Sequence, residues 1–184
     1  MFLVIHGFTS SSRSTKAQQL LKWLKAQGRE DEWVCPDLPI DPAEAIELLS
    51  KIIENSATPP KLVGSSLGGF YATVLSAKYN LKAVVINPAV NAGLVLRRAI
   101  GPQKAWHSEE TYEFTQAHVD SLNKMDLLAP ADPENIFLMA EMADETLDWK
   151  RAAAFYRDCH QLIFRGGDHG FSRFEQVIPL IDSF

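Results

Sequence analysis

The chain has 184 residues, of which 46% are hydrophobic and 22% charged, and its formal net charge is −5. This balance is typical of a soluble globular protein, and the length suits one domain with a full hydrophobic core. The acidic excess argues against a nucleic acid or an anionic membrane as partner, because no basic surplus is present to neutralise phosphates.

The cysteines and the N-terminus bear on the cellular compartment. Cys35 and Cys159 are far apart and form no Cys-x-x-Cys pair, which favours buried reduced thiols over a disulfide scaffold. The apolar run at the N-terminus has no basic segment before it and is too short for a signal peptide or a membrane span. We therefore expect a cytoplasmic protein.

Short apolar runs alternate along the chain with longer amphipathic segments. The runs are bounded by Gly, Pro or Asp and are mostly unalternated, which is typical of strands buried on both faces. They predict strands at residues 2–5, 33–35, 61–63, 83–86, 136–139 and 162–164. The amphipathic segments predict helices at residues 14–27, 67–79, 148–158 and 171–183, and a further helix that opens at Asp41-Pro42. This alternation predicts an α/β fold with a mainly parallel sheet of about six strands and helices on both faces.

Residues 87–131 interrupt the alternation. Helical patterns at 94–100 and 109–124 occur there without a convincing strand. A structureless loop of this length would be unusual, so we expect a small helical excursion over the edge where the strands end. Such an excursion either moves as a lid or covers the edge without moving. In both cases residues 1–184 are predicted to form a single domain.

A turn rich in glycine and serine joins the predicted strand at 61–63 to the helix at 67–79. It is not a phosphate loop, because no lysine stands at the helix start, nor a dinucleotide motif, because Ser66 occupies the middle glycine position. It matches the nucleophile elbow G-x-S-x-G at Gly64-Ser65-Ser66-Leu67-Gly68. Strand and helix approach each other closely at such a turn, which requires small residues on either side of the serine. An ordinary tight turn is the alternative.

A nucleophilic serine needs a base, because an alcohol is a poor nucleophile near neutral pH. Of the five histidines, His169 is favoured because it follows a predicted strand through a loop with two glycines, at the edge where catalytic groups gather. Asp144 also follows a predicted strand and is the preferred partner for the imidazole. Asp148 is the reserve, although a helix N-cap also explains it. The order Ser66, Asp144, His169 is the order expected of an α/β-hydrolase.

Further residues are predicted to contact the substrate. The backbone N–H groups of Phe8 and Leu67 are candidates for an oxyanion hole, because Phe8 follows the first strand and Leu67 begins a helix. Tyr71, Trp106 and Phe171 could line an apolar pocket, although large apolar side chains lie mostly in cores.

Several segments, taken together and in order, are specific to one family. They are His6-Gly7-Phe8 with Ser10-Ser11, Arg13-Ser14-Thr15-Lys16-Ala17, Leu62-Val63-Gly64-Ser65-Ser66-Leu67-Gly68-Gly69, Asn87-Pro88-Ala89-Val90, Asp144-Glu145-Thr146-Leu147-Asp148 and Gly166-Gly167-Asp168-His169. Over nearly its whole length the chain resembles the YqiA-like esterases, small bacterial members of the α/β-hydrolase superfamily. Ala143 and Gly170 depart from the family pattern, and both are small residues.

The resemblance implies an α/β-hydrolase fold and hydrolysis of carboxylic esters through an acyl-enzyme, without a metal or cofactor. It implies that Ser66 is the nucleophile, His169 the base and Asp144 the residue that orients the base. An acyl-CoA thioesterase or an acyltransferase would use the same residues, so the substrate is expected to be a small-molecule ester or thioester. A ligand-binding protein without catalysis is the alternative from another class, since the fold is also used in that way.

Overall fold

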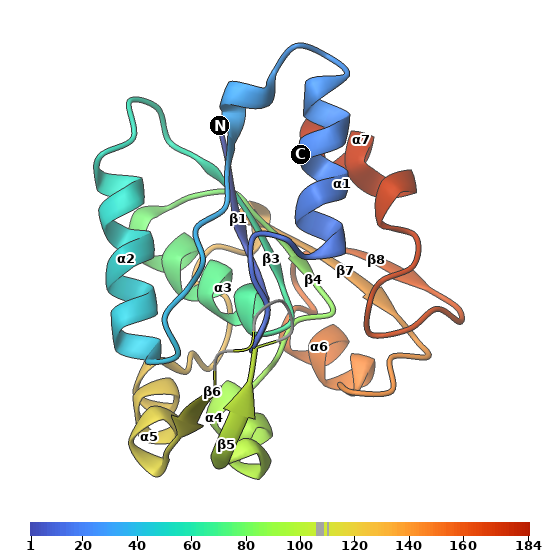
Figure 1. The fold of residues 1–184 in the computed structure, drawn as a ribbon. Helices are drawn as coiled ribbons and strands as arrows, with labels where there is room; N and C mark the ends of the chain where they lie inside the picture. Colours follow the sequence, from blue (N-terminus) through green and yellow to red (C-terminus); the bar gives the residue numbers. More distant parts are fainter. Residues whose placement is uncertain (106–108, 110) are drawn as a thin grey trace.

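The computed structural model describes residues 1–105, 109 and 111–184, and a six-stranded sheet forms its centre (Figure 1). The strand order is β2-β1-β3-β4-β7-β8, and every neighbouring pair is parallel. The strands of this sheet are β1 (Phe2–Ile5), β2 (Trp33–Val34), β3 (Lys61–Ser65), β4 (Ala83–Ile86), β7 (Ile136–Glu141) and β8 (His160–Phe164). The predicted mainly parallel sheet of about six strands is confirmed.

Helices connect the strands. They are α1 (Thr15–Lys25), α2 (Pro42–Glu54), α3 (Leu67–Tyr79), α4 (Ala92–Leu96), α5 (Gln116–Met125), α6 (Trp149–Phe155) and α7 (Phe174–Ser183). Short 3₁₀ turns occur at η1 (Glu30–Glu32), η2 (Arg97–Ala99) and η3 (Pro133–Asn135). No helix in the described part of the chain is both long enough and apolar enough to cross a membrane.

The sheet is buried on both faces, and each strand divides its side chains between two cores. In β1, Phe2 and Val4 pack with helices α1 and α7, whereas Leu3 and Ile5 pack with α2 and α3. All four are at most 5% exposed. Figure 1 shows the same division, with α1 and α7 on one side of the sheet and α2 and α3 on the other. This two-sided burial explains why the strands appear in the sequence as apolar runs without polar alternation.

Helix α3 approaches the sheet closely through two glycines. A Cβ atom at Gly68 would lie 2.0 Å from the carbonyl oxygen of Ile5 in β1. A Cβ atom at Gly64 would lie 2.2 Å from the carbonyl oxygen of Gly68. Both distances are far shorter than van der Waals contact, so only glycine fits at either position. The close approach predicted for the turn around Ser66 is therefore present.

The region between residues 87 and 131 contains a feature that the sequence did not predict. Strands β5 (Gly101–Lys104) and β6 (Thr111–Phe114) form an antiparallel hairpin between helices α4 and α5, where only helical pieces were expected. Phe114 is 1% exposed, and its ring stacks edge-on against Phe8 with centroids 5.0 Å apart. This tertiary packing overrides the local helical pattern. Figure 1 places the excursion beyond the carboxyl ends of the parallel strands, as expected.

The close contact at Gly68 leads to a stability prediction. We expect Gly68→Ala to lower the free energy of unfolding by about 3 kcal/mol, or to prevent folding, because the added methyl group would collide with the backbone of β1. Gly28→Ala is the control, since Gly28 has a φ of 67° but no atom within 4 Å of its Cβ position. That change should cost only about 1 kcal/mol of backbone strain. Urea unfolding measures both values, and equal losses would contradict the predicted clash.

Candidate active site

Ser66 lies at the sharp turn between strand β3 and helix α3. Its backbone has a φ of 56° and a ψ of −120°, a conformation that a residue with a side chain rarely adopts. Neighbouring backbone groups hold this conformation: the amide of Ser66 donates to the carbonyl of Ile86 at 3.0 Å, and its carbonyl accepts from the amide of Ala89 at 3.0 Å. The strained turn presents the side chain of Ser66 at the carboxyl edge of the sheet and at the N-terminus of α3.

His169 reaches Ser66 from the loop after strand β8, 103 residues further along the chain. Its Nε2 atom lies 3.2 Å from the Oγ atom of Ser66, and its Nδ1 atom lies 2.8 Å from the Oδ2 atom of Asp144. A carboxylate can only accept, so Nδ1 carries the proton and Nε2 is left to accept from the serine hydroxyl. The imidazole is therefore held in the tautomer that a base for Ser66 requires.

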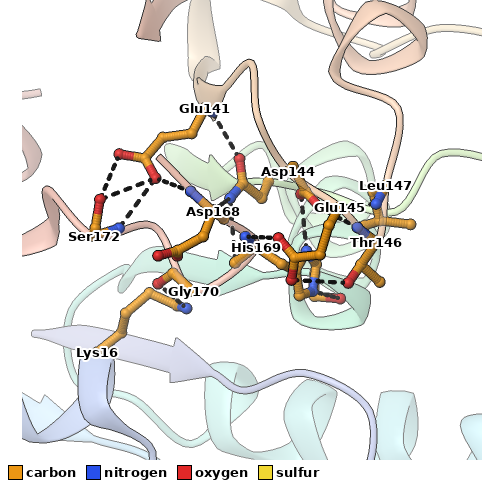
Figure 2. Close-up of polar contacts among 12 residues, drawn as sticks. Lys16, Glu141, Asp144, Glu145, Thr146, Leu147, Asp168, His169, Gly170 and Ser172 are labelled. Carbon is orange, nitrogen blue, oxygen red and sulfur yellow. Dashed lines mark hydrogen bonds and ion pairs between the residues drawn. The ribbon is translucent and has the colours of Figure 1, made fainter. Parts of the chain in front are cut away.

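Asp144 is held by the tight turn that follows strand β7. Its Oδ1 atom accepts from the amides of Thr146 and Leu147, both at 2.8 Å, and its side chain is only 2% exposed (Figure 2). Burial opposes ionisation, but the hydrogen bonds from His169 and from these amides outweigh it and hold the pKa of Asp144 below its ordinary value. The carboxylate facing His169 is thus fixed in place and charged.

Asp148, the reserve candidate, lies elsewhere. It is exposed and caps helix α6, where its carboxylate accepts from the amide of Lys150 at 3.0 Å. Of the two acids, the structure brings Asp144 and not Asp148 into hydrogen-bond contact with His169.

A cleft of about 830 Å³ opens beside Ser66 and His169, and both residues line it. Phe8 and Leu67 line it as well. Their backbone N–H groups donate no hydrogen bond to any other residue that the structure describes. A Cβ atom at Gly7 would lie 3.2 Å from the Cβ atom of Ser66, so the chain before Phe8 passes directly beside the serine.

His6 fixes the loop that carries Phe8. Its Nδ1–H group donates to the carbonyl of Gly7 at 2.9 Å, and its Nε2 atom accepts from the amide of Leu38 at 3.1 Å. The side chain is buried, with 5% of its surface exposed. His6 is therefore a packed structural group with both ring nitrogens engaged.

The aromatic residues predicted to line a pocket occupy different surroundings. Phe171 borders the cleft but is 1% exposed and packs in the core under α1 and α7. Tyr71 is 2% exposed and faces a smaller hollow of about 30 Å³ next to Phe8. Trp106 lies outside the described residues. The cleft is also lined by apolar residues that the sequence analysis did not name as pocket residues: Val95, Leu96, Ala99 and Leu147.

Polar residues that the sequence analysis gave no role surround the loop of His169. The Nζ atom of Lys16 donates to the carbonyl of Gly170 at 2.8 Å, and burial lowers the pKa of this lysine although nearby acidic side chains partly offset the effect (Figure 2). Asn87 and Glu141 are buried at the ends of strands β4 and β7 and contact the same loop. A polar residue at the end of an apolar strand is the signal that could have identified these two.

No group of three or more His, Cys, Asp or Glu side chains among the described residues is arranged to hold a metal ion. With its own side chains, the described site offers a serine hydroxyl in hydrogen-bond contact with an imidazole.

A comparison with protein families shows which family the chain belongs to. It belongs to the uncharacterised protein family UPF0227. The match extends over residues 1–184. The description of this family carries no activity, so it identifies relatives of the chain without assigning a reaction.

Comparison with solved structures identifies the fold. Mouse alpha/beta hydrolase domain-containing protein 10 is 17% identical, with a TM-score of 0.74 over 99% of this chain and 88% of that one. Est1E from Butyrivibrio proteoclasticus is 16% identical, with a TM-score of 0.73 over 100% and 85%. A monoacylglycerol lipase from Paleococcus ferrophilus is 14% identical, with a TM-score of 0.71 over 99% and 93%. The protein therefore has the α/β-hydrolase fold, shared at low identity with esterases and lipases.

The lowered pKa of Asp144 predicts how stability depends on pH. Since the folded-state pKa lies below the unfolded value of about 3.9, the unfolded chain binds more protons in acid. The stabilisation by Asp144 is therefore present above that unfolded value and is lost as the pH falls through the folded one. We expect the free energy of unfolding to decrease below about pH 4, and less steeply in Asp144→Asn than in the wild type.

Urea unfolding from about pH 3 to pH 6 measures this dependence. Glu113→Gln, at an exposed position in the hairpin, is the matched loss of a carboxylate and should keep the wild-type slope. Identical slopes for the wild type and Asp144→Asn would show that the buried carboxylate does not contribute.

Proposed function

We propose that the protein is a serine esterase that hydrolyses carboxylic esters through an acyl-enzyme. The observation that carries the proposal is the continuous hydrogen-bonded chain from Ser66 through His169 to Asp144, with distances of 3.2 Å and 2.8 Å, at the wall of an open cleft. The α/β-hydrolase fold supports it, because esterases and lipases share that fold. Est1E, one of the similar structures, has been solved with ferulic acid bound.

In the proposed first step, the Oγ atom of Ser66 attacks the ester carbonyl while Nε2 of His169 takes the hydroxyl proton. Asp144 stabilises the imidazolium that forms and keeps its Nδ1–H group oriented. The carbonyl oxygen becomes an oxyanion, and the amides of Phe8 and Leu67 are proposed to donate to it. Both amides border the cleft and have no donor contact with the described residues, so they are available for this role.

Collapse of the tetrahedral intermediate transfers the proton from His169 to the leaving alcohol and leaves the acyl group on Ser66. Water then enters, His169 takes one of its protons, and the hydroxyl attacks the acyl-enzyme. The second intermediate releases the carboxylic acid and restores the proton to Ser66. The N-terminus of α3 lies next to the reacting oxygen throughout, and its positive dipole end favours the negative charge in both steps.

The cleft wall suggests the character of the acyl group. Its side toward the excursion includes the apolar Val95, Leu96 and Ala99 together with Arg98 and Gln103, whereas its side toward α1 is mostly polar, with Ser14, Lys16 and Gln19 beside Ala17. We propose that an apolar acyl chain lies against the excursion and that the alcohol leaves along the polar side. A panel of chromogenic esters and acyl-thioesters of increasing chain length tests both this orientation and the preferred leaving group.

The nucleophile can be tested directly. A fluorophosphonate probe should label the wild type at Ser66, located by mass spectrometry of the digested protein. Ser66→Ala should lose the label and lower the turnover of any hydrolysed ester by roughly 10⁴- to 10⁶-fold, because no hydroxyl remains to attack. A folded wild-type protein that takes no label and hydrolyses no ester would contradict the proposal and favour a ligand-binding protein.

The assignment of the acid can be tested with a matched pair. Asp144→Asn should lower kcat by about 10⁴-fold, because an asparagine stabilises the wrong imidazole tautomer. Asp148→Asn is the control, since Asp148 is an exposed helix cap four residues away and asparagine caps helices as well as aspartate does. Kinetics on the same ester should show activity close to wild type for the control. The opposite pattern would mean that Asp148 is the acid.

A further inference from the structure

The loop between strand β8 and helix α7 carries His169 but has no regular structure of its own. Its backbone groups are bound mainly by side chains from other parts of the chain. Glu145 accepts from the amide of His169 at 3.0 Å, and Lys16 donates to the carbonyl of Gly170 at 2.8 Å, but both are at least partly exposed. Two buried polar residues, Glu141 and Asn87, also hold the backbone of this loop.

Glu141, the last residue of β7, is 0% exposed and accepts from the start and the end of the loop. Its Oε2 atom accepts from the amide of Asp168 at 2.8 Å and from the amide of Ser172 at 3.1 Å (Figure 2). Its Oε1 atom accepts from the guanidinium of Arg173 at 2.6 Å. Burying a carboxylate is costly unless it is paired and hydrogen-bonded, and here each oxygen has partners from the loop or the adjoining helix.

Asn87 follows directly after β4 and is 3% exposed. It binds the same stretch of the loop by donating to the loop's backbone carbonyl groups. Its Nδ2 atom donates to the carbonyl of Asp168 at 3.0 Å and to the carbonyl of His169 at 3.2 Å. Its Oδ1 atom accepts from the amide of Glu141 at 2.9 Å. Asn87 therefore binds both the loop and the residue that holds the loop from the other side.

Glu141 lies so close to the loop that position 167 has room only for glycine. Gly167 has a φ of 82°, and a Cβ atom built there would lie 1.9 Å from Oε2 of Glu141. A side chain at position 167 would displace the carboxylate from the amides that it accepts from. The loop and Glu141 are thus fitted to each other at the residue pair directly before His169.

We propose that Asn87 and Glu141 are positioning residues that fix the backbone of His169 so that its imidazole bridges Ser66 and Asp144. This inference rests on the proposed esterase function. Near His169, the hydrogen bonds of Asn87 and Glu141 go to backbone groups of the loop and not to Ser66 or the imidazole. Both residues therefore act through the peptide groups on either side of position 169. A displacement of reacting groups by about 1 Å can cost on the order of 10²-fold in rate.

The test uses two near-isosteric variants. Asn87→Asp keeps the acceptor for the amide of Glu141 and loses the donor to the two loop carbonyls. Glu141→Gln keeps one acceptor oxygen and replaces the other with an NH₂ group, which cannot accept the hydrogen bonds that the second oxygen accepts. We expect each variant to lower kcat by about 10- to 100-fold while KM changes less than about threefold, because the imidazole is misplaced and the cleft is unchanged. Activity is counted per site that the fluorophosphonate labels, so that an unfolded fraction does not contribute.

Proton NMR gives a second readout. The Nδ1 proton of His169, shared with the Asp144 carboxylate, should give a far-downfield resonance in the wild type that shifts upfield or broadens in both variants. Tyr156→Phe is the control: it removes a buried hydrogen bond of 2.8 Å to Thr73, and both of these residues lie away from the cleft. It should leave kcat and the resonance unchanged even if it lowers stability. Each variant is measured independently, so one that fails to fold leaves the other to decide.

Two results would overturn the inference. One is a kcat equal to that of the wild type in a folded Asn87→Asp or Glu141→Gln variant. The other is a loss that affects kcat and KM together and leaves the resonance intact, which would mean a merely structural role. A wild-type protein without esterase activity would instead refute the proposed function, so the two failures are distinguishable.

Discussion

The imidazole of His169 can contact a hydroxyl on one side and a carboxylate on the other only because parallel strands deliver their carboxyl ends to one edge of the sheet. Ser66 follows β3, Asp144 follows β7 and His169 follows β8. In a parallel sheet with helical crossovers, residues that are distant in sequence meet at this edge. The position of each side chain therefore depends on the register of the sheet and on two cores that hold the strands rigid from both faces.

The edge of the sheet also concentrates polar and strained groups that would be unfavourable elsewhere. Ser66, Asn87 and Phe171 all have positive φ values, and Glu141 is a fully buried carboxylate. Each of these features costs free energy by itself. They persist because the surrounding backbone supplies hydrogen bonds that a relaxed conformation would lose. The rigid scaffold thus stabilises a region whose own local preferences oppose it, which is the usual relation between a fold and a reactive site.

The sequence predicted the strands and helices of the main sheet correctly, because their hydrophobic patterns are local. Buried runs predicted the strands of the main sheet, and the boundaries of strands and helices moved by only a few residues. Helix α7, for example, begins at Phe174 and leaves out Phe171, whose φ of 58° is not helical. The helical prediction was wrong for part of the excursion, where β5 and β6 pair with each other and Phe114 packs on Phe8. A short amphipathic segment fits a helix or a strand almost equally well, and the neighbour that decides between them lies about a hundred residues earlier in the chain.

For the candidate site, the sequence alone determined which residue types could act and in what order they occur along the chain. It also indicated that small residues must flank the serine, because strand and helix approach each other closely at such a turn. The structure shows that only glycine fits at position 68, because the neighbour there is the backbone of β1. The tertiary structure decided which aspartate faces His169, where the cleft lies and which buried groups hold the histidine loop. Asp144 and Asp148 have similar local contexts in the sequence, and only the path of the turn after β7 separates a side chain that meets the imidazole from one that caps a helix. Such contacts join residues far apart along the chain, so they depend on how the strands align and pack, which no local pattern encodes.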